Sequence, residues 1–254
     1  MARNIVESLK LQTSDRILEI GPGKGALTAL LLERLDELTA VEIDDSLARL
    51  LKDTFGRALT LIHDNVLNVD LHALAQAKGG KLRIVGNIPY NITSPILFWI
   101  IDSSKDVADC TIMMQREVAL RLVAKPRTKE YGILSIFAQY YSTPALKFTV
   151  APGSFYPVPD VTSAVVSLDF TAPHPSRTSD DALFRLIVRT VFGKRRKTLR
   201  NGLRDMKVRT DLLGQSAIDL SRRPEELSVD DFVLLANELF RGGIGETTKR
   251  IEPV

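Results

Sequence analysis

The segment RILEIGPGKGALTALLLERL (16–35) decides the fold class of this 254-residue chain. It opens with a short apolar run that is typical of a strand, and from Ala26 onward its apolar residues recur every three or four positions, as in an amphipathic helix. The turn between them, GPGKG (21–25), has three glycines in five residues, so its backbone can pass close to a ligand. A strand, a glycine-rich turn and a helix in this order are typical of a parallel α/β sheet.

The same alternation continues along the chain. A second helical pattern, DSLARLLKDTF, covers residues 45–55, and residues 116–141 predict two more helices. Further strands are predicted at LTAVEI (38–43), ALTLIH (58–63), LRIVGN (82–87), DCTIMMQ (109–115), ALKFTV (145–150) and SAVVSLDF (163–170). Right-handed crossovers between such strands give a doubly wound, mostly parallel seven-stranded sheet with helices on both faces.

A linker divides the chain, because TAPHPSRTSD (171–180) has no apolar period. Every apolar pattern that follows is helical, namely DALFRLIVRTVF (181–192), KTLRNGLRDM (197–206) and VDDFVLLANELF (229–240). We therefore expect one α/β domain over residues 1–171, a small all-helical domain over residues 180–241 and a polar tail over residues 242–254.

Basic residues are concentrated after the linker. Residues 1–170 carry 18 basic and 19 acidic side chains, whereas residues 171–254 carry 16 and 12. Between residues 185 and 209 the basic ones are Arg185, Arg189, Lys194, Arg195, Arg196, Lys197, Arg200, Arg204, Lys207 and Arg209, against Asp205 alone. A solvated helix face is the commonest explanation of such a run, but this density also favours a polyanionic partner.

The composition excludes several classes of protein. With 44% hydrophobic residues the chain can bury a core, and 15 Gly with 12 Pro exclude collagen-like material. The single cysteine, Cys110, cannot form an internal disulfide, and His63, His72 and His174 lack metal-ligand spacing, so we expect no metal site. No apolar run reaches the roughly 20 residues that cross a bilayer, and no signal-peptide pattern is present. We expect a cytoplasmic protein without a membrane partner.

Ligands of open parallel sheets bind at the carboxyl ends of the strands. Glu42 ends the second predicted strand, where an acidic residue accepts hydrogen bonds from ribose hydroxyls. Asp64 follows the third, where a carboxylate could accept from an adenine amino group, although a plain loop residue is an equal alternative. The glycine spacing fits neither a phosphate-binding P-loop nor the dinucleotide fingerprint. These strand ends together predict a nucleoside site.

The fourth predicted strand ends in GNIPYN (86–91). The side-chain oxygen of Asn87 and the carbonyl beside Pro89 give two fixed acceptors for the hydrogens of an exocyclic amino group. Tyr90 offers a flat face on which a base can stack. Together these groups would aim the nitrogen of a planar amine at an electrophile without any strong base.

These residues are part of a wider resemblance, to the KsgA-type ribosomal RNA adenine dimethyltransferases. It is carried by EIGPGKGALT (19–28), VEID (41–44), GNIPYNIT (86–93), FYPVPDVTSAVV (155–166), VFGKRRKTLRNGL (191–203) and SRRPEELSVDDFVLLANEL (221–239), and so covers nearly the whole chain. The Asn-x-Pro-Tyr motif alone marks any methyltransferase that acts on amino groups of nucleic acids. The last two segments are more specific, because they resemble the helical domain of this family.

The resemblance implies a class I methyltransferase fold, related to the Rossmann fold, that uses S-adenosylmethionine and releases S-adenosylhomocysteine. Two methyl groups would go to N6 of each of two adjacent adenosines, in the loop of the last hairpin of small-subunit (16S) ribosomal RNA. The partner would be the immature 30S subunit, so the chain would act in ribosome biogenesis. The α/β domain would bind the cofactor and the helical domain the RNA, and we expect a monomer.

The resemblance also assigns roles by position. Cofactor contacts are implied for Glu19, Gly21, Gly23, Glu42, Ile43, Asp64, Asn65 and Asn87. Asn87 and the Pro89 region would hold the target amine, Tyr90 would stack on the base, and Phe155 would close on its other face. RNA contacts are expected from Lys194, Arg195, Arg196, Lys197, Arg200, Arg222 and Arg223.

The sequence departs from the family's pattern at its start. Family members usually begin with a basic stretch and a Gln-x-Phe-Leu-like segment that folds over the cofactor, and MARNIVESLK (1–10) matches neither. We expect this difference to bear on cofactor affinity and activity, and the fold to survive it.

Three alternative functions are open. A large-subunit RNA adenine methyltransferase of the antibiotic-resistance (Erm) type shares the catalytic motif, but the RRPEELSVDDF (222–232) and KRRKTLRN (194–201) segments argue against it. A DNA adenine methyltransferase is disfavoured because no added target-recognition domain is present. A non-catalytic RNA-binding assembly factor is disfavoured by the intact Asn87 motif and by Glu42.

Overall fold

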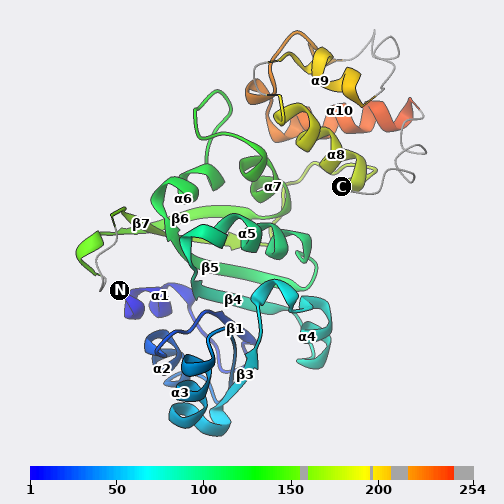
Figure 1. Cartoon of the computed structure of the whole chain (residues 1–254). Helices are drawn as coiled ribbons and strands as arrows, with labels where there is room; N and C mark the ends of the chain where they lie inside the picture. Colours follow the sequence, from blue (N-terminus) through cyan, green and yellow to red (C-terminus); the bar gives the residue numbers. More distant parts are fainter. Residues whose placement is uncertain (155–159, 195–196, 207–216, 243–254) are drawn as a thin grey trace. The chain divides into compact units, whose positions relative to one another are not determined.

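The computed structural model describes residues 1–154, 160–194, 197–206 and 217–242 of the chain (Figure 1). By their internal contacts the residues form two compact units. Residues 1–123 and 141–173 form the first, which we call the sheet unit. Residues 124–140 and those from 174 onward form the second, the helical unit. The segment 124–140 thus packs with the later helices, although in the sequence it lies among the strands of the α/β domain.

The sheet unit contains the predicted seven-stranded sheet, with strand order β3-β2-β1-β4-β5-β7-β6. Its strands are β1 (Ile17–Ile20), β2 (Leu38–Glu42), β3 (Leu59–His63), β4 (Leu82–Asn87), β5 (Val107–Gln115), β6 (Thr143–Val150) and β7 (Ser163–Asp169). The first five run parallel, whereas β7 pairs antiparallel with both β5 and β6. The predicted doubly wound, mostly parallel sheet is confirmed.

Six α-helices of the described residues belong to the sheet unit. They are α1 (Ala2–Leu9), α2 (Ala26–Leu32), α3 (Asp45–Phe55), α4 (Leu71–Ala77), α5 (Thr93–Asp102) and α6 (Arg116–Leu122). The prediction for 45–55 is confirmed to the residue, and Asp44 caps this helix by accepting from the backbone N–H groups of Ser46 and Leu47 at 2.8 Å each.

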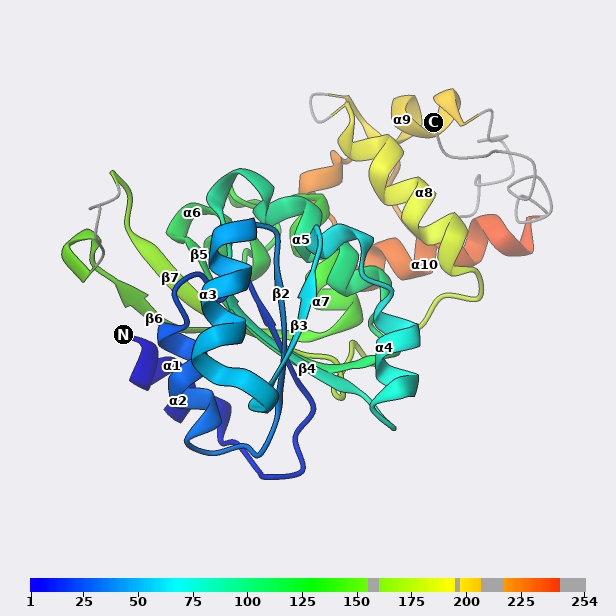
Figure 2. The same cartoon turned by 60° about the horizontal axis from the view of Figure 1, so that its bottom comes forward.

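Both faces of the sheet are covered, as Figures 1 and 2 allow the reader to follow. One core cluster joins α1, α2 and α3 to every strand, for example through Leu31, Leu38 and Val85. Side chains of neighbouring strand residues point to opposite faces, and the alternate residues Leu18 and Ile84 are fully buried as well. The central strands are therefore buried on both faces, whereas the edge strands β3 and β6 carry exposed residues.

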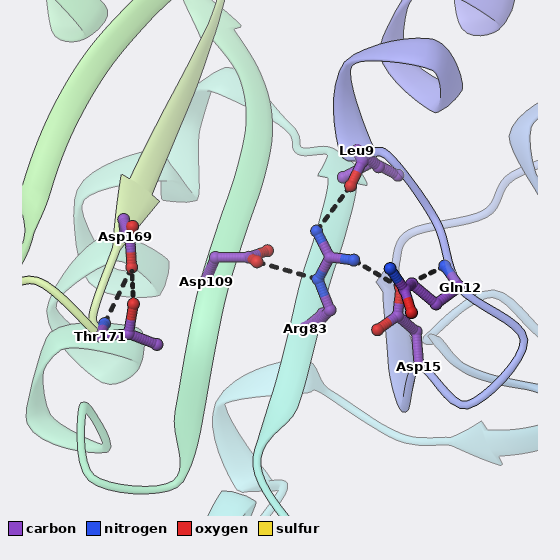
Figure 3. Close-up of polar contacts among 7 residues, drawn as sticks. All are labelled: Leu9, Gln12, Asp15, Arg83, Asp109, Asp169 and Thr171. Atoms are coloured by element: carbon purple, nitrogen blue, oxygen red, sulfur yellow. Dashed lines mark hydrogen bonds and ion pairs between the residues drawn. The ribbon is translucent and has the colours of Figure 1, made fainter.

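A polar cluster ties the amino-terminal edge of the sheet together (Figure 3). Arg83 of β4 donates to Asp109 of β5 at 2.8 Å, to Asp15 before β1 at 2.5 Å, and to the carbonyl of Leu9 at 2.7 Å. One guanidinium thus joins two strands, the loop before β1 and the end of α1. This edge lies opposite the carboxyl ends, where the sequence places the site.

The helical unit is built around aromatic side chains. Its described α-helices are α7 (Ile133–Tyr141), whose last residue is counted with the sheet unit, and α8 (Asp181–Phe192), α9 (Leu199–Asp205) and α10 (Val229–Arg241). The ring of Phe184 lies 6.1 Å from that of Phe137 and 4.3 Å from that of Tyr140, between centroids. These contacts place α7 in the core of this unit. None of the helices described is long and apolar enough to cross a membrane.

Candidate nucleoside and base-amine site

The glycine turn after β1 has a conformation that requires glycine. Gly21, Gly23 and Gly25 all have positive φ, at 63°, 58° and 83°. Gly25 is also closed in by α3, because a Cβ there would lie 2.5 Å from Cε2 of Phe55. The turn therefore has no side chain at three of its five positions, and it leads directly into α2.

Glu42, at the end of β2, fastens that turn. Its Oε2 accepts a hydrogen bond from the backbone N–H of Gly23 at 3.2 Å. Its Oε1 accepts from Ile43 at 2.9 Å and from Asp44 at 3.1 Å. A carboxylate has about four lone-pair directions, so three backbone donors leave room for a ligand hydroxyl. The acidic residue and the glycine turn, 19 residues apart, form one structural element.

Glu19 lies inside the protein, with 1% of its surface exposed. Its Oε2 accepts from the Thr28 hydroxyl of α2 at 2.7 Å. Burial raises the pKa of Glu19 to about 7, and the nearby charge of Glu42 adds to the rise. Glu19 is thus close to Glu42, and its described hydrogen bond goes to α2.

The end of β3 supplies polar groups and the rim of the site an apolar one. Asp64 is exposed, and its Oδ1 accepts from the Asn65 backbone at 2.6 Å and from the Asn68 amide at 2.8 Å. Asn65 caps the short helix η2 (Val66–Asn68) by accepting from Leu67 at 3.0 Å. Ile43, next to Glu42, keeps 66% of its surface exposed. An apolar side chain so exposed beside polar strand ends suits the face of a nucleobase.

Asn87 ends β4 with an exposed side chain, next to the glycine turn across the sheet. A Cβ on Gly21 would lie 3.9 Å from the backbone oxygen of Asn87. Tyr90 follows in η3 (Tyr90–Ile92), and its hydroxyl lies 2.7 Å from that of Ser163, the buried first residue of β7. The Pro89 carbonyl accepts from the Thr93 hydroxyl at 3.2 Å. These bonds fix the Tyr90 ring and the Pro89 carbonyl, which both follow Asn87 closely in the sequence.

The strand order brings the predicted residues to one edge. Strands β3, β2, β1 and β4 are neighbours and parallel, so Asp64, Glu42, the glycine turn and Asn87 follow one another across their carboxyl ends. Sequence reasoning missed Ser163, which lies 73 residues from Tyr90 in the chain. Phe155 lies outside the described residues.

The predicted RNA contacts belong to the helical unit. Lys194, Lys197, Arg200 and Arg223 are exposed, whereas Arg195 and Arg196 lie outside the described residues. Arg222 is half-buried and donates to the Glu226 carbonyl at 2.6 Å and to Asp231 at 3.3 Å. Its guanidinium thus bonds within the unit. In the described part of the chain no cluster of His, Cys, Asp and Glu could hold a metal ion.

Comparison with known protein sequences gives close matches. A family model described as ribosomal RNA adenine dimethylase matches residues 1–240. The chain is 46% identical over 240 residues to the ribosomal RNA small subunit methyltransferase A of Chlorobium phaeobacteroides, covering 94% of this chain and 88% of that protein. It is 41% identical over 246 residues to the protein of the same name from Alkaliphilus oremlandii, covering 93% and 86%.

Solved structures resemble the fold over nearly its whole length. A dimethyladenosine transferase from Plasmodium falciparum has a TM-score of 0.78 at 23% identity, covering 95% of this chain and 96% of that one. The 23S rRNA methyltransferase ErmE has a TM-score of 0.67 at 22% identity, covering 94% and 96%. At these identities the likeness concerns the fold alone.

Proposed function

Because this chain belongs to the ribosomal RNA adenine dimethylase family, we propose that it methylates N6 of two adjacent adenosines in the 3'-terminal hairpin loop of small-subunit ribosomal RNA. S-adenosylmethionine is the donor, and each adenosine becomes N6,N6-dimethyladenosine. The relatives at 41% and 46% identity are named for the small subunit, which supports this target over large-subunit RNA. The likeness to ErmE does not weigh against it, since that likeness concerns the fold alone.

The observation that best supports this function is the row of strand ends formed by Asp64, Glu42, the glycine turn and Asn87. The donor fits this row by its chemistry. Glu42 offers acceptors to a ribose, the exposed Ile43 offers an apolar surface to an adenine, and Asp64 offers a carboxylate to its amino group. The bare backbone at Gly21 and Gly23 admits the methionine part.

The chain's own contribution to the reaction is to hold and orient the target amine. When bound, S-adenosylmethionine supplies an electrophilic methyl group. The lone pair of an adenine amino group is delocalised into the ring, so the amine is a weak nucleophile. Hydrogen bonds from that amine to the Asn87 side chain strengthen as the nitrogen gains positive charge, and so favour the transition state over the ground state. Tyr90, fixed by Ser163, offers a stacking face that offsets the cost of extruding the base.

The proposed function also implies a macromolecular partner and a cellular location. The substrate is an immature small subunit in the cytoplasm, and the chain acts on it as a monomer. The exposed basic residues of the helical unit supply phosphate contacts, so binding weakens steeply with salt.

Methyl transfer to unmethylated small subunits tests this function. With radiolabelled S-adenosylmethionine, label is expected in small-subunit RNA as dimethyladenosine and not in large-subunit RNA. Asn87→Ala is expected to lower the rate of methyl transfer about 10²-fold to 10³-fold, since it removes an acceptor aimed at developing charge. The Kd for S-adenosylmethionine, measured by calorimetry, is expected to change by less than about threefold.

The matched control is Asn4→Ala, on the exposed surface of α1, which is expected to transfer at the normal rate. Label in large-subunit RNA alone would move the chain to the large-subunit class. Normal transfer by the Asn87 variant would remove Asn87 from the reaction.

A further inference from the structure

We propose that residues 124–132, AKPRTKEYG, form part of the RNA-binding surface and contact phosphates through Lys125 and Arg127. We call this segment the basic loop. The inference rests on the proposed function and adds to it a surface that the sequence places among the strands, outside the helical domain. The RNA contacts expected from the sequence lie between residues 194 and 223, outside this loop.

The basic loop is anchored to the helical unit at two points. The backbone N–H of Arg127 donates to the Glu225 carbonyl at 2.8 Å. The buried Tyr131 hydroxyl donates to the Leu227 carbonyl at 2.8 Å. Within the loop, Thr128 donates to the Lys125 carbonyl through its backbone at 3.2 Å and its hydroxyl at 2.7 Å. The loop therefore has a fixed path on the turn at residues 224–227.

The same stretch of chain holds the start of α9. The backbone N–H of Leu199 donates to the Arg222 carbonyl at 2.9 Å, and that of Arg200 donates to the Leu220 carbonyl at 3.0 Å. The basic loop and the predicted RNA-binding residues of α9 are thus attached to one segment, residues 220–227. Two basic elements that are some 70 residues apart in sequence are therefore joined through one segment of the helical unit.

Basic side chains dominate the exposed positions of these elements. In residues 124–132, 197–204 and 219–227 the exposed basic residues are Lys125, Arg127, Lys129, Lys197, Arg200, Arg204 and Arg223, and the exposed acidic ones are Glu130 and Asp219. Glu225 and Glu226 are half-buried, and Glu226 is 4.0 Å from the Arg127 guanidinium, which keeps 74% of its side-chain surface exposed. A surface with this excess of positive charge attracts a polyphosphate chain, and each neutralised phosphate releases a counterion.

Arg127 is held in a conformation that its residue type disfavours. Its φ is 70°, and in the described part of the chain Lys10 is the one other non-glycine residue with positive φ. Glycine or asparagine adopts this conformation more easily, because a longer side chain crowds the backbone there. An exposed arginine on an anchored backbone of this conformation supports the proposed phosphate contact.

The test is the salt dependence of binding to unmethylated small ribosomal subunits, measured for the full chain between about 50 and 200 mM salt. Arg127→Asn removes the charge with a residue that tolerates the backbone conformation. It is expected to weaken binding about threefold to tenfold and to lower the slope of log K against log salt by about 1. Arg127→Lys is expected to keep the slope. The matched control, Arg57→Asn, changes an exposed arginine just before β3 in the sheet unit and is expected to change neither quantity.

An unchanged slope for Arg127→Asn would overturn the proposal, whatever the affinity, because the contact would not involve a phosphate. A slope lowered equally by Arg57→Asn would overturn it too, since the effect would then be one of net charge. Methyl transfer by the unaltered chain is measured in parallel. Its failure would refute the proposed function, whereas the binding slopes decide the role of the basic loop.

Discussion

Glu19 is a carboxyl group enclosed beside the glycine turn, and its protonation is linked to folding. Burial raises its pKa from an ordinary 4.5 to about 7, with a further rise from Glu42 and opposition from the hydrogen bond of Thr28. Between pH 4.5 and 7 the folded chain therefore holds a proton that the unfolded chain has lost. Its contribution to stability is present below about pH 4.5 and is lost as the pH rises through 7.

Glu19→Gln should remove this linkage. We expect the unaltered chain to lose about 3 kcal/mol of unfolding free energy between pH 4 and 8 relative to the variant, since one pKa unit corresponds to about 1.4 kcal/mol. Urea denaturation of both proteins at several pH values measures the difference. Parallel stability curves for the two proteins would show that the Glu19 proton does not contribute.

Some residues of the site could be identified from the sequence alone and others could not. Glu42 and Asn87 could be identified because each closes a strand, and strand ends of a parallel sheet meet at one edge. Their roles toward the donor and the target amine stay predictions. The bond between Tyr90 and Ser163 could not be foreseen, because it depends on β7 entering the sheet antiparallel beside β5.

Among the elements, β4 carries both the site and the cluster that secures the opposite edge. Arg83 has 17% of its side-chain surface exposed, and Asp15 and Asp109 have 16% and 26%. Oδ1 of Asp109 is buried and has no hydrogen-bond partner among the residues that the structure describes. Removal of the guanidinium would leave two half-buried carboxylates and the Leu9 carbonyl without their cation (Figure 3).

Arg83→Met is therefore expected to lower the unfolding free energy by about 2–4 kcal/mol, because it breaks an ion-pair cluster by removing one partner. Combining it with Asp109→Asn should restore part of the loss, since one uncompensated charge then disappears. Lys81→Met, at an exposed position just before β4, is the control and should stay within about 0.5 kcal/mol. Equal effects of Arg83→Met and Lys81→Met would show that the cluster adds nothing to stability.

The elements also show where periodicity stops being informative. The apolar residues of α3 recur every three or four positions among polar ones, so this helix could be placed to the residue. The sequence pattern predicts no element at Thr93–Asp102, where the structure has α5, TSPILFWIID. Its seven central residues, PILFWII (95–101), are all apolar and show no polar face, so their pattern cannot separate a buried helix from a buried strand.

At the scale of the whole molecule, one segment that lies within the predicted α/β domain in sequence packs with the helical unit in the structure. The sequence predicts a cut at residue 171, whereas residues 124–140 pack with the residues from 174 onward. The reason is tertiary: the partners of Tyr131 and Phe137, Leu227 and Phe184, lie 96 and 47 residues away. Local patterns carry no trace of such contacts.

This arrangement predicts how fragments of the chain behave. A fragment of residues 1–173 keeps the sheet but leaves Tyr131, Phe137 and Tyr140 without the aromatic partners of the helical unit. We expect it to expose apolar surface, bind the dye ANS and associate, because exposed aromatic clusters of this kind favour aggregation. Replacing residues 124–140 of the fragment with a short glycine-serine linker should give a monomer that no longer binds the dye. Size-exclusion chromatography with ANS fluorescence separates the two fragments. A monomeric, dye-free 1–173 fragment would show that the segment packs stably without the later helices, and the cut at residue 171 would then be the physical boundary.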